Sequence, residues 1–89
     1  MSPQEQRKYY ETYFNLFLTD GWKQLIEDVE DSAQTVERST VYNANTEREL
    51  HHAKGSLMVY NYLLRLEESL RDAYDILEAD LQYNEEEEL

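Results

Sequence analysis

The stretch that decides the fold is residues 46–83, TERELHHAKGSLMVYNYLLRLEESLRDAYDILEADLQY. Its apolar side chains recur at intervals of three and four residues, the spacing of one face of an α-helix. They are Leu50, Ala53, Leu57, Tyr60, Leu64, Leu70, Tyr74, Leu77 and Leu81. Thr46 followed by Glu49 forms a capping box, so we predict a helix over about residues 47–83. Gly55 inside it predicts the close approach of a neighbouring helix.

This predicted helix is long for so small a chain. It would measure roughly 50 Å, whereas a compact domain of 89 residues has a radius of gyration of about 12 Å. Residues 47–66 are expected to pack antiparallel on the preceding helix, because the connection is short. Residues 67–83 are expected to overhang, or to meet the first helix or another subunit. The predicted interface stripe is Tyr60, Leu64, Leu70, Tyr74, Leu77 and Leu81.

Two shorter helices precede the long one. Ser2, Pro3 and Glu5 form a helix start, and the first helix is expected over about residues 3–18. The second is expected over about residues 20–38, and residues 39–46, rich in Ser, Thr and Asn, are expected to form the loop of a hairpin. The predicted hairpin core is Trp22, Ile26, Val29, Leu50 and Leu57.

The expected fold class is therefore all-α. A helical hairpin follows a shorter helix in a single domain over residues 1–83, the long third helix projects, and an acidic tail occupies residues 84–89. Eight tyrosines are more than so small a core can hide. Aromatic side chains are enriched in interface cores, so we expect several tyrosines in a subunit interface and the chain to form a homo-oligomer.

The charge is strongly negative and unevenly distributed. Residues 1–66 carry ten acidic and seven basic side chains, and residues 67–89 carry ten acidic and one basic. Direct binding to nucleic acid or to an anionic membrane is disfavoured, because both need Lys and Arg. A basic protein is the partner that such a segment would attract, although solubility alone also explains it. The predicted partner-facing acids are Glu67, Glu68, Asp72, Asp75 and Asp80.

No motif for catalysis, a cofactor or a metal is recognisable. The only histidines, His51 and His52, are adjacent. Adjacent residues on a helix point about 100° apart and do not readily chelate one ion. There is no cysteine, no nucleotide-binding glycine loop and no apolar run near the roughly 20 residues of a membrane span. We therefore expect neither an enzyme nor a metal or cofactor site.

Two stretches together resemble short acidic proteins of tailed bacteriophages. They are residues 14–31, FNLFLTDGWKQLIEDVED, and residues 46–67, TERELHHAKGSLMVYNYLLRLE, about half of the chain. The shared features are an aromatic helix, a Gly-Trp turn and an E-L-H-x-x-K-G-x-L pattern, which here is Glu49, Leu50, His51, Lys54, Gly55 and Leu57.

The resemblance implies a phage origin and no catalytic residue. It suggests an accessory virion protein, of the head–tail or internal type, that packs through its helices against itself or a larger phage structural protein. The alternative is a small acidic inhibitor that mimics DNA and binds a basic host enzyme. The expected location is the virion or the host cytoplasm.

Overall fold

The computed structural model describes residues 1–43 and 45–88, which form three helices and, over those residues, no strand. The helices are α1 (Pro3–Phe17), α2 (Asp20–Asn43) and α3 (Glu47–Glu88). The all-α prediction is therefore confirmed. Side chains are described below for residues 1–40 and 45–85.

Local hydrogen bonds explain where each helix begins. The Oγ of Ser2 accepts a hydrogen bond from the Glu5 N–H at 3.2 Å, and Pro3 occupies the first helical turn. Thr19 starts α2, because its Oγ1 accepts from the Trp22 N–H at 3.2 Å. Thr46 starts α3 in the same way, accepting from the Glu49 N–H at 3.1 Å. These hydroxyls satisfy N–H groups that have no partner within the helix.

The end of α2 differs from the prediction. The helix continues to Asn43, five residues beyond the expected end at Arg38. The hydroxyls of Thr35 and Thr40 donate back to carbonyls four residues earlier, at 2.9 and 2.8 Å. Threonine thus satisfies its hydroxyl inside the helix instead of ending it. Of the predicted loop, Ala44 lies outside the described residues.

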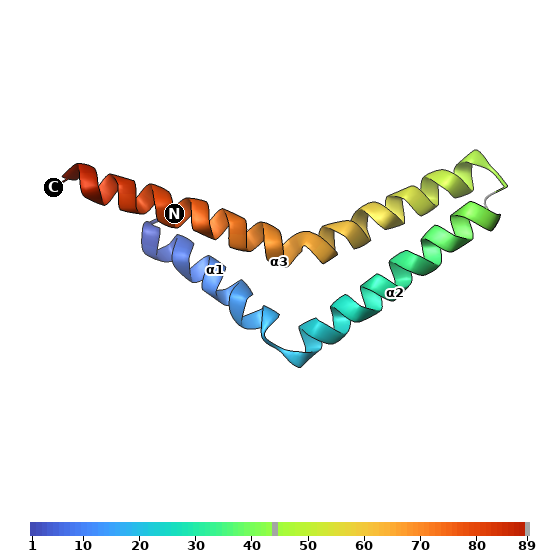
Figure 1. The fold of residues 1–89 in the computed structure, drawn as a ribbon, viewed down its shortest axis with the longest axis horizontal. Coiled ribbons are helices and arrows are strands. Elements are labelled where there is room, and N and C mark those ends of the chain that lie inside the picture. Colours follow the sequence, from blue (N-terminus) through green and yellow to red (C-terminus); the bar gives the residue numbers. More distant parts are fainter. Residues whose placement is uncertain (44, 89) are drawn as a thin grey trace.

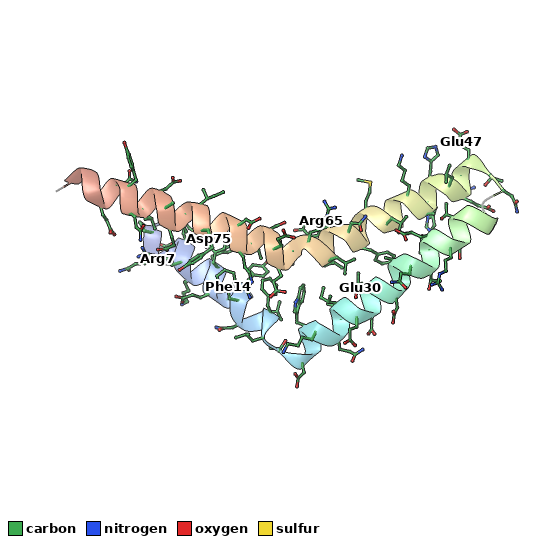
Figure 2. The ribbon with its side chains drawn as sticks, in the orientation of Figure 1. Arg7, Phe14, Glu30, Glu47, Arg65 and Asp75 are labelled. Carbon is green, nitrogen blue, oxygen red and sulfur yellow. The ribbon has the colours of Figure 1, made fainter. Side chains whose placement is uncertain are left out.

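The three helices form a flat V (Figure 1). Helices α1 and α2 are joined by Leu18 and Thr19 and form the outer V, and α3 bends to follow both of them (Figure 1). The second half of α3 lies along α1 and the first half lies along α2, each antiparallel to its neighbour. The bend falls beside Arg65, whose side chain extends away from α1 and α2 (Figure 2).

This arrangement corrects the expected projection of the third helix. Residues 67–83 do not overhang, because α1 folds back along them within the same chain (Figure 1). Only the last turns of α3 extend past the start of α1 (Figure 1). The helix also runs to Glu88, so residues 84–88 of the predicted tail are helical, whereas Leu89 lies outside the described residues.

The core is a single seam between the outer V and α3. Its buried side chains, each between 3% and 7% exposed, are Phe17, Trp22, Val29 and Ala33. The rings of Phe17 and Trp22 meet with centroids 4.9 Å apart where α1 turns into α2. The molecule measures 64 × 29 × 17 Å, with a radius of gyration of 18.8 Å. It is one layer of helices thick, so both faces of the seam border the surface.

Candidate interaction surface

The predicted hairpin core divides into buried and exposed members. Trp22 and Val29 are buried, Ile26 and Leu57 are half-buried, and Leu50 is exposed. Leu50 lies close to the start of α3, where the two-helix layer ends. The seam therefore buries its side chains best near the α1–α2 junction.

The predicted interface stripe faces the other helices of its own chain. All six of its residues are half-buried. The ring of Tyr74 makes edge contacts with Tyr10 and Phe14, at centroid distances of 5.8 and 5.3 Å. The stripe is therefore partly covered within the chain, by α2 along its first half and by α1 along its second, and contact with the first helix was one of the alternatives expected for residues 67–83.

Other apolar residues of α3 are exposed instead. Met58, Val59, Tyr62, Ile76 and Tyr83 are each between 59% and 69% exposed. None of Met58, Val59 and Ile76 was predicted as an interface residue. The sequence could have indicated a second apolar stripe, because Tyr62, Ile76 and Tyr83 are separated by multiples of seven residues. Residues with that spacing lie on one side of a helix.

One face of the seam is occupied by charged side chains. We call it the charged face and define it by Arg7, Phe14, Arg71 and Glu78. The Nε of Arg7 lies 2.7 Å from a carboxylate oxygen of Glu78. The hydrogen bond that Arg7 donates to Glu78, together with the negative charge of Glu78, raises the pKa of Arg7. The guanidinium of Arg71 lies 5.4 Å from the centre of the Phe14 ring. On this face, side chains of α1 and α3 contact each other within the chain.

The opposite face carries tyrosines from α1 and α3. On α1, helical rotation places Tyr9 and Tyr13 on one flank of Tyr10, and Arg7 and Phe14 on the other. The rings of Tyr9 and Tyr13 meet edge to face with centroids 5.3 Å apart. Tyr13, through its charge and its hydrogen bond, raises the pKa of Tyr9. On α3, helical rotation places Leu66 and Leu70 on the same flank as Leu77, which lines a hollow with Tyr9.

The same face is hollowed along α3. Tyr62, Leu66 and Leu70 line a shallow hollow of ≈ 390 Å³. A second hollow, of ≈ 140 Å³, lies between Tyr9 and Leu77. Tyr62, Leu66 and Leu70 are spaced by four residues, so they form one continuous strip along the helix. We call this surface the tyrosine face and define it by Tyr9, Tyr13, Tyr62, Leu66 and Leu70.

The predicted acidic residues lie on the second half of α3. Glu67 is half-buried and accepts a hydrogen bond of 3.0 Å from Arg71. The remaining four, which are exposed, are Glu68, Asp72, Asp75 and Asp80. The V therefore has arms of unequal charge. The arm built from residues 1–19 and 67–88 carries a net −9, and the arm built from residues 20–66 carries a net −3.

The histidines lie near the start of α3, at the far end of the second arm. His51 is exposed, and its Nε2 lies 3.7 Å from a carboxylate oxygen of Glu47. His52 lines an open hollow between α2 and α3 together with Thr40 and Tyr60. Across the described residues, no three His, Asp or Glu side chains are grouped so as to hold a metal ion. None of the helices, in the part of the chain that is described, is long and apolar enough to cross a membrane.

Comparisons with known proteins add no family to this description. No family model, no curated protein and no solved structure matches the chain.

Proposed function

We propose that this protein is a non-enzymatic assembly component that acts by packing its helices against another protein. The observation that supports the proposal is the excess of accessible surface. The chain exposes 7359 Å², whereas a compact folded monomer of 10.7 kDa exposes about 5,500 Å². The difference, about 1,900 Å², lies in the range that one partner contributes to an obligate interface.

The resemblance to short acidic phage proteins supports a particular setting for this role. In that setting the protein is an accessory component of the virion, bound to copies of itself or to a larger phage structural protein. Quantitative mass spectrometry of purified particles tests the setting. Presence in a fixed stoichiometric ratio to a structural protein would support it, and absence from particles that retain infectivity would refute it.

A second candidate function rests on the acidic arm. Four exposed carboxylates along the second half of α3 favour an inhibitor that occupies the nucleic-acid groove of a basic host enzyme. The net −9 of residues 67–88 extends over about 33 Å of helix. That is roughly half the charge density of duplex DNA, which carries one charge per 1.7 Å.

The acidic candidate has a separate test. The variant Glu68→Gln/Asp72→Asn/Asp75→Asn/Asp80→Asn keeps the helix but removes four charges. Under the inhibitor hypothesis it would lose binding to a basic groove at low salt. Unchanged binding by this variant would refute charge mimicry and leave the assembly role as the function.

A further inference from the structure

The tyrosine face leaves two large aromatic side chains open to solvent. Tyr62 is 67% exposed and Tyr9 is 46% exposed, although both are large and aromatic. Leu66 and Leu70 beside them are half-buried. The charged face, by contrast, carries the Arg7–Glu78 ion pair. The open face therefore presents large aromatic side chains, which are enriched in interface cores, with Arg65 at the border of its hollow.

We propose that the tyrosine face binds a second copy of this chain, in a face-to-face dimer in which the two α3 helices run antiparallel. The inference rests on the proposed assembly function and names the partner in it. Two-fold symmetry places the same face of both copies in contact, which is the commonest arrangement in homodimers.

The surface area supports a second copy. A stable interface buries about 800 Å² per partner, and obligate homodimers bury about 1,000 to 2,500 Å² per partner. The excess of about 1,900 Å² estimated above falls within the homodimer range. A face-to-face dimer would also convert a layer 17 Å thick into two layers around one core, which is the usual construction of a domain.

The charge distribution supports the antiparallel orientation. A two-fold axis through the bend of α3 superposes the outlines of the two V-shaped copies (Figure 1). It lays the −9 arm of each copy, with Tyr9 and Tyr13, over the −3 arm of the other, and brings the two copies of Tyr62 close together near the axis. A parallel arrangement would lay the two −9 arms together, and like charges at close range repel. The antiparallel dimer therefore minimises repulsion between identical acidic chains.

A basic protein is the competing occupant, and it predicts a different surface. Its binding would be strongest on the exposed carboxylates of the second half of α3. It would also weaken as salt increases, because opposite charges are screened. Dimerisation of two chains of charge −12 should instead strengthen with salt, because the screened force is repulsive.

The experiment is sedimentation equilibrium of the full chain from about 1 μM to 1 mM, at low and high salt. The unmodified protein is compared with the variants Tyr62→Glu, Tyr62→Phe and Leu18→Glu. The expected mass of the unmodified protein is twice 10.7 kDa. Tyr62→Glu places a charge in the tyrosine face and should weaken association roughly tenfold to a hundredfold. Leu18→Glu is the matched control, because Leu18 is 70% exposed and follows Phe14 by one helical turn, on the charged face.

Orientation is tested by cross-linking, since the chain has no cysteine of its own. Ser69 and Asp80 are both exposed. In the antiparallel dimer, Ser69→Cys lies near the two-fold axis and should be joined to its counterpart by a short bismaleimide. Asp80→Cys residues would lie about 40 Å apart and should not be joined. Cross-linking through Asp80→Cys would refute the antiparallel orientation.

The remaining outcomes are equally decisive. A monomer over the whole concentration range would overturn the dimer but leave the assembly role, because a monomer can still be found in particles. Dimerisation weakened by Leu18→Glu and not by Tyr62→Glu would overturn the assignment of the face. Circular dichroism of each variant must match that of the unmodified chain, and Tyr62→Phe, which keeps the ring, should restore dimerisation.

Discussion

Replacing Trp22 with alanine removes the aromatic side chain that closes the corner of the V. Trp22 is 7% exposed and its ring lies 4.9 Å from that of Phe17. An aromatic side chain buries roughly 200 Å², which at about 25 cal/mol per Å² corresponds to about 5 kcal/mol. Measured Trp→Ala and Phe→Ala costs of about 3–5 kcal/mol agree with this value.

This loss is large, because only four side chains are buried among residues 1–40 and 45–85. Domains of this length are stable by about 4–13 kcal/mol, and a one-layer seam belongs at the lower end. We therefore expect Trp22→Ala to be largely unfolded at room temperature. Trp22→Phe, which keeps an aromatic ring against Phe17, should retain most of the helical signal.

The assay is urea denaturation followed by far-ultraviolet circular dichroism, at one protein concentration for all variants. Leu18→Ala is the control, because Leu18 adjoins the same corner but is 70% exposed. Its free energy of unfolding should change by less than about 0.5 kcal/mol. If Trp22→Ala cost less than about 1 kcal/mol, the corner would not be the centre of stability and the reasoning would fail.

Three further predictions concern local features. Thr46→Ala removes the cap of α3 and should lower the free energy of unfolding by about 1 kcal/mol, measured by urea denaturation; no change would show that the Thr46 hydroxyl is not needed there. Gly55→Ala should raise it by about 0.5–1 kcal/mol, because an added Cβ meets no atom within 4 Å; a loss would mean that something covers Gly55. Tyr13→Phe should lower the raised pKa of Tyr9 towards its ordinary value, as followed by spectrophotometric titration. A Tyr9 pKa unchanged by Tyr13→Phe would contradict the pairing. Because the pKa of Tyr9 is raised in the folded state, its protonated form contributes to folding stability below the ordinary pKa of about 10. This contribution to stability should be lost as the pH rises through the folded-state pKa.

The features that could be predicted from the sequence are the local ones. Ser2 and Thr46 begin helices where their capping patterns indicated, since a cap depends on residues three positions apart. Gly55, predicted to mark the approach of a neighbouring helix, has open space around it. That prediction was wrong because it concerned contacts between helices, which spacing along one helix does not specify.

The sequence left the placement of α1 open for a related reason, with contact to residues 67–83 as one of three alternatives. The overhang was expected because α3 is longer than a compact globule of this chain length. The chain is instead an elongated V with a radius of gyration of 18.8 Å, in which α1 extends alongside α3. The stripe at Tyr74 and Leu77 correctly indicated a packed surface, but periodicity is the same whether the partner is α1 or another chain.

The continuity of α3 restricts where insertions and deletions can be accommodated in this sequence. One uninterrupted helix runs through both arms, from Glu47 to Glu88. Adding or deleting a single residue at its bend would rotate everything beyond that point by about 100°. Tyr74 would then turn away from α1, and Glu78 would leave Arg7. Changes in length within α3 should therefore disrupt its packing on α1, whereas substitutions there can keep the register of both arms.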